Sequence, residues 1–564
     1  MSSRVRSFLQ FALAFIAGAV AASMMIMLQL NRIDLKSLSG FEMSRKVIVE
    51  DRRLQIPAGL LLPPSIWEND DIRQGSCRIA LPDKKDTKFF DIWRLPKLSQ
   101  CETGAGASKL EGDTLIELKG KCKGKLQYRA FDGVELGPAK DLRDRVEIGD
   151  VENVIVICDS GGHKLYDFHV RVKRNEKVIK RSLENRIAFE KQNDNKNHLS
   201  VVVLMVDSLT REHAIRVLPR TLDWMGRAQD YELFDYTRFN TVGKGTKMNF
   251  TPVFFGNISA DFVNSITFES LNMLYERAGF ATAFIEESCI NNTGSMGRIV
   301  RKKVKDKLTK EERIEFMKAF RDLSDHSLGN VFCDVMKMMK VQNFFSDSTK
   351  QKICFAGELM QKHLLRYLSD FVDTYADDVG VFATIKTNEA HESTYSRVAL
   401  LDSDLLEFVR DTMQKHPNLA IVLMGDHGIG YGDLSETFTL TVEYNLPGLF
   451  MLLPKSYTRT LPPNMLTNLR ENQNKLVTGL DLHATFADLA FYGSGKTTNG
   501  RSFMRPIGNA SCTELNIPNA RCSCSEFSNE PTEMKLWKGN VLSHVNLSNQ
   551  HSLLCNFSPL LVQQ

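Results

Sequence analysis

Apolar runs that alternate with helical patterns constrain the fold of this chain more than any other feature of its sequence. The runs lie at residues 201–206, 280–285, 379–385, 419–424 and 448–453. Helical patterns occur between them, notably at 271–277 and 396–415. Strands that are apolar along their whole length are typical of parallel sheets, because both faces of such a sheet are covered by helices. The sequence therefore predicts an α/β domain with a mostly parallel sheet and helices on both faces.

The remaining segments differ in composition, and a chain of 564 residues is too long for a single core. Short strand-like stretches separated by glycines precede the α/β pattern, at 114–118, 125–131, 151–158 and 166–172. These stretches predict a small β-rich N-terminal domain. We assign residues 76–195 to the β-rich domain, 196–505 to the α/β domain and 506–564 to a Cys-containing C-terminal extension.

The stretch 8–30 carries no charged residue and is long enough to span a bilayer, which takes roughly 20 apolar residues. Arg4 and Arg6 precede it, which indicates a cytoplasmic N-terminus. A cleaved signal peptide is the alternative, but its apolar core is usually only about 7–15 residues long. We therefore predict a single-pass type II membrane protein with a lumenal or extracellular domain, or alternatively a secreted protein. The expected segments are a cytoplasmic tail at 1–7, a transmembrane signal anchor at 8–30 and a stalk at 31–75.

Cysteines and glycosylation signals agree with passage through the secretory pathway. All eleven cysteines lie at Cys77 or later, on the predicted lumenal side, where disulfides form. Their odd number leaves at least one thiol without an intrachain partner, and the sequence does not reveal the pairing. Asn-x-Ser/Thr sites occur at Asn249, Asn257, Asn291, Asn509, Asn546 and Asn556. The net charge of +4 is small for this length and gives no reason to expect a nucleic-acid partner.

Polar residues follow two of the apolar runs directly. Asp207 comes after 201–206, and Asp426 and His427 come after 419–424 between two glycines. Ligands of α/β sheets bind beyond the carboxyl ends of the strands, and Asp and neutral His are good ligands for zinc or manganese. Each feature alone has a structural explanation. An Asp after a strand is often only the N-cap of a helix, and an Asp-His-Gly string can form an ordinary turn. Their joint occurrence favours a metal site, with the flanking glycines permitting a tight turn.

A Gly-rich turn at 242–245 leads into a possible helix that starts near Thr246. Backbone N–H groups at a helix start favour anions. A Thr hydroxyl becomes a nucleophile only when a base or a metal activates it. Alone, this pattern is more typical of an ordinary capped turn.

The order of Asp207, Thr246 and the Asp-His-Gly string resembles the alkaline phosphatase/sulfatase-like superfamily. Within it, the chain resembles an animal family that is expanded in nematodes and known as a domain of unknown function. The resemblance extends over roughly 70–524. The segments that carry it are 205–211, 242–246, 354–357, 424–428, 481–485 and 521–524.

The resemblance implies a Thr246 nucleophile bound to a divalent metal, zinc or manganese, with Asn249 beside it in the catalytic group. It implies metal ligands at Asp207, Thr246, Asp426 and His427, and a second metal-binding or phosphate-facing group at His391 and His483, completed by Glu389 or Glu392. Relatives commonly have Thr-Phe-Pro-Asn at the nucleophile, whereas this chain has Lys and Met between Thr and Asn. The Cys-x-Pro/Ala-x-Arg string of formylglycine sulfatases does not occur, which argues against that chemistry.

The implied activity is a metal-dependent hydrolase of phosphate or related anionic esters, acting in the secretory lumen or outside the cell. The substrate would be an anionic ester of a glycan, a lipid or a small molecule, and the N-terminal helix would hold the protein at the membrane. One alternative is a transferase of phospho-alcohol groups to glycans or lipids. Another is a catalytically inactive cell-surface binding protein. The sequence does not fix the oligomeric state.

Overall fold

The computed structural model describes residues 59–65, 77–79, 93, 101, 104–131, 136–193, 198–258, 269–287, 323–329, 354–490, 499–525, 533–538 and 541–546. The chain divides into two units, Met1–Gln55 and Ile56–Gln564, and every described residue belongs to the second. The predicted tail, the transmembrane anchor at 8–30 and most of the stalk lie outside the described residues. No helix within the described residues is long and apolar enough to cross a bilayer.

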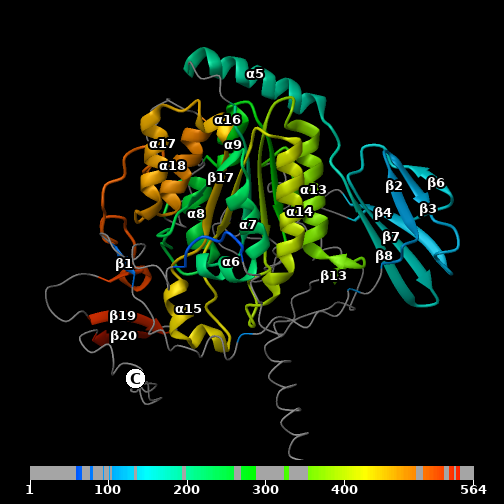
Figure 1. The fold of residues 1–564 in the computed structure, drawn as a ribbon. Coiled ribbons are helices and arrows are strands. Elements are labelled where there is room, and N and C mark those ends of the chain that lie inside the picture. The colour runs from blue at the N-terminus through cyan, green and yellow to red at the C-terminus, as the bar shows by residue number, and fades with distance from the viewer. Residues whose placement is uncertain are drawn as a thin grey trace, which may run out of the picture. The chain divides into compact units, whose positions relative to one another are not determined.

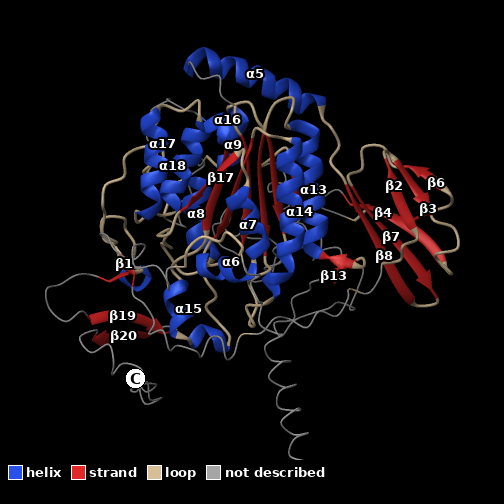
Figure 2. Ribbon diagram, viewed as in Figure 1, coloured by secondary structure: helices blue, strands red, loops and turns tan. Residues whose placement is uncertain are grey.

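A seven-stranded sheet in the order β10-β17-β16-β9-β15-β11-β12 forms the centre of the α/β domain (Figures 1 and 2). Strand β17 runs antiparallel to both of its neighbours, and the pairs from β16 to β12 are parallel. The prediction of a mostly parallel sheet is therefore confirmed. The strands are β9 (Ser200–Val206), β10 (Tyr231–Asp235), β11 (Ala281–Glu286), β12 (His326–Gly329), β15 (Val381–Thr387), β16 (Leu419–Gly425) and β17 (Leu449–Pro454).

Five of these strands coincide within two residues with the five predicted apolar runs. Every residue of β9, β11, β15, β16 and β17 is buried, which is why their sequences are apolar without alternation. The sequence did not reveal β10 or β12. Both are edge strands, and β10 is only partly buried, so its sequence mixes polar and apolar residues.

Helices cover both faces of the sheet (Figure 1). Helices α8 (Thr246–Phe255), α9 (Leu271–Arg277) and α18 (Gly479–Ala490) lie on one face. Helices α7 (Pro219–Arg227), α13 (Met360–Tyr375) and α14 (Leu401–Lys415) lie on the other. The predicted helical stretch 396–415 is split into the short turn η3 (Arg397–Leu400) and α14.

Alternate residues of β9 enter one large apolar core. Val201, Val203 and Met205 pack in the same buried cluster as Phe250 of α8 and Phe486 of α18. This packing fixes α8 and α18 against the sheet.

Shorter elements complete the described chain. They are α6 (Arg211–Val217), η4 (Asp433–Glu436), α15 (Phe438–Glu443), α16 (Lys455–Thr458), α17 (Pro463–Glu471), η5 (Asn472–Asn474), η6 (Asn519–Arg521), β1 (Arg78–Ile79), β13 (Cys354–Phe355), β14 (Glu358–Leu359), β18 (Cys524–Ser525), β19 (Glu533–Lys538) and β20 (Val541–Asn546).

The segment before the α/β domain contains two small sheets. It forms a three-stranded sheet of β2 (Ser108–Glu111), β3 (Thr114–Glu117) and β6 (Arg145–Glu147), and a four-stranded sheet of β5 (Lys140–Asp141), β4 (Lys125–Phe131), β7 (Asn153–Ser160) and β8 (His163–Val170). These strands share an apolar cluster of their own. Helix α5 (Glu176–Asn193) follows and packs on α9 and β11, with Phe189 in the large core. A helix within the predicted β-rich segment therefore joins the α/β core.

Disulfides join parts of the chain that are far apart in sequence. The pairs are Cys77–Cys524, Cys101–Cys354, Cys122–Cys158 and Cys512–Cys522, so every cysteine among the described residues is paired. Cys77–Cys524 spans 447 positions and Cys101–Cys354 spans 253. Disulfides are typical of oxidising compartments, which agrees with a lumenal or extracellular domain.

Candidate active site

The carboxyl ends of three adjacent strands bring charged residues to one edge of the sheet. Strand β9 lies between β15 and β16 and is parallel to both. Asp207 follows β9, Asp426 and His427 follow β16, and Lys386 is the penultimate residue of β15. These four residues therefore meet where α/β sheets bind their ligands.

Asp207, Asp426 and His427 form a compact group with the chemistry of a metal site. One ligand atom of each lies within 4.8 Å of the others, and all three residues are buried. The Nε2 atom of His427 lies 3.8 Å from Asp207 Oδ1 and 3.5 Å from Asp426 Oδ2. Asp426 Oδ1 accepts hydrogen bonds from the backbone N–H groups of Ser208 and His427. Its Oδ2 atom is buried and has no hydrogen-bond partner among the described residues.

The backbone fixes the tautomer of His427. Its Nδ1 atom lies 2.7 Å from the carbonyl oxygen of Gly428. A carbonyl oxygen only accepts, so Nδ1 carries the proton and the neutral ring has a lone pair on Nε2. The ring thus presents its free nitrogen to the two carboxylates, as metal-binding histidines do.

The glycines beside Asp426 and His427 are needed for space. A Cβ atom at Gly425 would lie 1.9 Å from the carbonyl oxygen of Leu209, and one at Gly428 would lie 2.6 Å from Tyr444 Cα. Neither glycine has a positive φ angle. Glycine is therefore needed at these two positions because neighbouring backbone atoms approach closely, and not because of the tight turn that the sequence predicted.

Thr246 is the first residue of α8, and its hydroxyl reaches this group. Its Oγ1 atom donates to Asp207 Oδ2 at 3.2 Å and lies 3.3 Å from His427 Nε2. The preceding Gly245 has a φ of 77° and supplies no side chain to cap the helix start. The partly exposed Thr246 therefore stands between solvent and the buried acids, beside backbone N–H groups that favour anions.

Asn249 braces the Gly-rich turn and makes none of its hydrogen bonds to Thr246. Its Oδ1 atom accepts from the N–H groups of Val242 and Gly243, and its Nδ2 atom donates to the carbonyls of Gly243 and Gly245. This geometry makes Asn249 a positioning residue for the turn. Its amide is buried and both hydrogens are engaged, so the sequon at Asn249 is a poor acceptor for a glycan in the folded protein.

Lys386 is the main site residue that the sequence reasoning missed. Its fully buried ammonium donates to Asp207 Oδ2 at 2.6 Å and to Asn388 Oδ1 at 3.0 Å. Burial alone would lower the pKa of Lys386, but Asp207 and the other nearby carboxylates raise it above its ordinary value. Burial would likewise raise the pKa of Asp207, yet the positive charge of Lys386, followed by smaller effects of His391 and, when it is protonated, of His427, lowers it strongly. Asp207 and Lys386 therefore form a buried ion pair.

A signal for Lys386 was present in the sequence. It is the first residue after the predicted run 379–385, as Asp207 is the first after 201–206. The rule that found the aspartates also applies to this lysine.

The residues proposed for a second group are placed differently from one another. His391 is partly exposed, its Nδ1 lies 2.9 Å from the hydroxyl of Tyr431, and its charge contributes to the lowered pKa of Asp207. Glu389 pairs with Arg397 at 2.7 Å, and burial raises the pKa of Glu389 to about 8 against the effect of that arginine. His391 is thus close enough to act on the site electrostatically.

Glu392 is engaged by its own loop. Its carboxylate accepts from the backbone N–H groups of Thr394, Ser396 and Arg397. These bonds hold the loop after β15 and account for both oxygens, so they favour a structural role for Glu392.

The structure does not bring His483 to the metal-type group. The Nδ1 atom of His483 lies 2.9 Å from the carbonyl oxygen of Val253, and burial lowers the pKa of the ring. Val253 is seven residues beyond Thr246 on α8, about 10 Å along a helix. His483 therefore packs α18 against the far end of α8.

A family model described as "Protein of unknown function (DUF229)" matches residues 119–559 of the chain. The search of curated proteins found no match.

Several solved structures are similar to the chain. The zinc complex of the C-terminal periplasmic domain of EcEptC from Escherichia coli is 12% identical, with a TM-score of 0.37, covering 62% of this chain and 94% of that one. The lipoteichoic acid synthase LtaP from Listeria monocytogenes is 12% identical, with a TM-score of 0.38, covering 66% and 91%. A protein in the alkaline phosphatase superfamily from Vibrio parahaemolyticus is 14% identical, with a TM-score of 0.36, covering 60% and 80%.

Proposed function

The chain belongs to the family described as "Protein of unknown function (DUF229)", and from its site we propose a metal-dependent enzyme that cleaves phosphate or related anionic esters. We place it in the alkaline phosphatase/sulfatase-like superfamily, with Thr246 as the nucleophile. One observation carries the proposal. The hydroxyl of Thr246 lies within 3.3 Å of both Asp207 and His427, and His427 in turn lies 3.5 Å from a buried oxygen of Asp426 that has no hydrogen-bond partner among the described residues.

The donor set fits a divalent metal. Two carboxylates, one neutral imidazole and one hydroxyl suit zinc or manganese. A buried carboxylate oxygen without a partner is costly in free energy, and a cation would compensate for it. Asp207, Asp426, His427 and Thr246 would hold the ion. When bound, a metal of this kind acts as a Lewis acid and favours deprotonation of a hydroxyl that contacts it.

The residues of the chain orient the nucleophile and keep its neighbour charged. Thr246 Oγ1 donates its proton toward Asp207 Oδ2, and the lowered pKa of Asp207 keeps that carboxylate ionised. Attack forms a bond between Thr246 Oγ1 and phosphorus and breaks the bond between phosphorus and the alcohol oxygen, and the proton that Thr246 loses leaves with the alcohol. Attack on the same phosphorus by water, or by an acceptor hydroxyl, then breaks the bond between phosphorus and Thr246 Oγ1, and the proton of the attacking group returns to Thr246.

The surroundings of Thr246 favour an anionic substrate. The start of α8 directs N–H groups toward the site, and no acidic residue lies in its first turn. Lys244 is exposed and Lys247 partly exposed on either side of the nucleophile. Lys247 therefore adds a cation next to the nucleophile.

The intact constellation favours an enzyme over an inactive binding protein. Hydrolysis and transfer to a glycan or lipid share the first step and differ only in the acceptor, so products distinguish them. The disulfides support action in the lumen or outside the cell. We also propose that residues 8–30 anchor the protein in the membrane.

We expect metal removal to abolish turnover. The full-length protein is assayed on a panel of phosphate monoesters and diesters, before and after chelation and after addition of zinc or manganese, with alcohol release as the readout. Activity should vanish on chelation and return with one of these metals. Turnover that survives complete metal removal would contradict the metal requirement, and no turnover on any ester by metal-loaded protein would contradict the activity. Free phosphate from a monoester, or a phosphate monoester from a diester, indicates hydrolysis, and a modified acceptor indicates transfer.

A further inference from the structure

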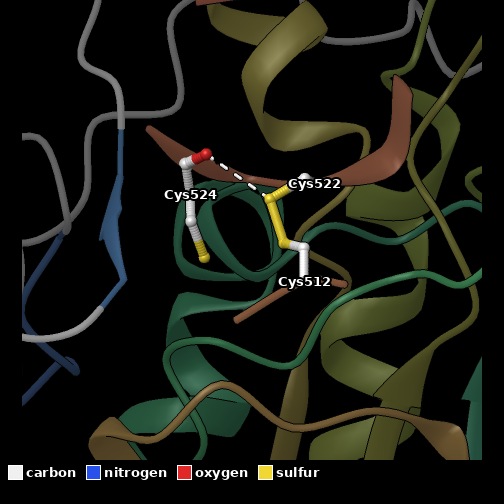
Figure 3. Close-up of side chains that lie close together, drawn as sticks. All are labelled: Cys512, Cys522 and Cys524. Atoms are coloured by element: carbon white, nitrogen blue, oxygen red, sulfur yellow. Dashed lines mark hydrogen bonds between the residues drawn. A yellow bond between two sulfur atoms is a disulfide. The ribbon is translucent and has the colours of Figure 1, made fainter. Parts of the chain in front are cut away.

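Two neighbouring disulfides hold the segment Arg521–Cys524 in place. Cys522 is bonded to Cys512, and Cys524 to Cys77. The sulfurs of Cys512, Cys522 and Cys524 lie within 4.8 Å of one another, and the sulfur of Cys522 is 3.4 Å from the carbonyl oxygen of Cys524 (Figure 3). Because all three sulfurs are in disulfides, this group is a covalent clamp rather than a metal site.

The backbone of the clamped segment is also tied to the α/β domain. Asn240 donates from Nδ2 to the carbonyl oxygen of Arg521 and accepts at Oδ1 from the N–H group of Ser523. Asn240 and Arg521 are both buried. The position of Arg521 is thus fixed by hydrogen bonds on its own backbone and by the adjacent disulfides.

A chain of contacts leads from Arg521 to the metal-type group. The guanidinium carbon of Arg521 lies 4.7 Å from the centre of the Tyr444 ring. The Tyr444 ring stacks on the His427 ring at 5.5 Å, with an angle of 24° between the planes. The Tyr444 hydroxyl accepts from the N–H group of Gly245, next to the nucleophile. Tyr444 therefore contacts both the imidazole ligand and the turn that carries Thr246.

We propose that Arg521 is a positioning residue for this site, which holds Tyr444 against His427 and the Gly-rich turn. The inference rests on the proposed metal site and extends it. A cation over an aromatic face is attracted most strongly where water is excluded, as it is here. The clamp keeps this cation in place, which gives a role to the Arg-Cys-Ser-Cys string at 521–524.

Cobalt(II) binding to the full-length protein tests the role of Arg521. Its visible absorption reports the geometry of the ligands, and competition with a chelator gives its affinity. Loss of a group that orients a metal-binding histidine typically weakens metal binding by about 10–100-fold. We expect Arg521→Ala to weaken cobalt binding by roughly 10-fold or more and to alter the spectrum. Arg521→Lys keeps a cation over the Tyr444 ring and should recover part of the cobalt affinity and part of the wild-type spectrum.

Matched variants separate this role from general stability. Arg505→Ala removes an ion pair between the exposed Arg505 and the buried Asp488 in the same C-terminal region and should leave cobalt binding unchanged. If Arg521→Ala fails to fold, Arg521→Met keeps most of the buried side-chain volume without the charge and should show the same loss. If a folded Arg521→Ala or Arg521→Met variant bound cobalt with the affinity and the spectrum of the wild-type protein, the inference would be overturned. If the wild-type protein itself binds no cobalt, the proposed function fails instead.

Discussion

Replacement of Thr246 by alanine is expected to reduce ester turnover by at least about 1,000-fold, because the nucleophile is lost. The fold should survive, since Thr246 is partly exposed at the first position of α8. Thr246→Ser keeps a hydroxyl at the same place and should retain part of the activity. The measurement is kcat/KM on the ester that the wild-type protein cleaves best, together with thermal unfolding of each variant.

Thr467 provides a matched control for this substitution. It is an exposed threonine of α17, and its hydroxyl donates to the carbonyl oxygen of Pro463. Thr467→Ala should turn over substrate like the wild-type protein. If Thr246→Ala kept the kcat/KM of the wild-type protein, a group other than Thr246 would have to attack the ester.

Among the substitutions considered, Lys386→Met is expected to lower the free energy of unfolding the most. Its ammonium is fully buried and lies 2.6 Å from Asp207, so the variant leaves a buried carboxylate without its cation. Breaking a buried ion pair by removal of one partner typically costs about 3–5 kcal/mol in the free energy of unfolding. The value is measured by denaturant unfolding of the metal-free protein. Zinc or manganese should restore part of the loss, because binding to the folded state stabilises it.

A lysine–aspartate pair at the surface is the control for Lys386. Lys415 lies 2.9 Å from Asp373, and its side chain is 58% exposed. Lys415→Met should cost less than about 1 kcal/mol, as exposed pairs do. If both variants unfold at the same denaturant concentration without metal, the buried pair does not contribute as proposed.

The part of the site that lies at strand ends could be predicted from the sequence. Strands buried on both faces give unbroken apolar runs, and the parallel order places the residues after them at one edge. This reasoning located Asp207, Asp426 and His427, which the structure brings together. The same reasoning applies to Lys386, which also follows an apolar run. Lysine is not a usual metal ligand, so a search for metal-binding residues does not find it.

Other parts depend on packing that the sequence does not encode locally. His483 lies on an entirely buried helix, where a ligand and a packed histidine give the same pattern. Arg521 contacts Tyr444 from a segment that two disulfides hold, and one of these spans 447 positions of the sequence. Edge strands such as β10 are partly exposed and lack an apolar signal.

The metal content of the full-length protein, beside that of Asp426→Ala, tests the proposed site most directly. The substitution removes the buried oxygen that has no hydrogen-bond partner among the described residues. Both proteins are loaded with zinc or manganese, freed of excess metal by gel filtration and analysed by elemental mass spectrometry, with circular dichroism to confirm folding. We predict near-stoichiometric metal in the wild-type protein and almost none in the folded variant. Equal metal contents in the two proteins, or no metal in either, would contradict a metal site at Asp207, Asp426 and His427.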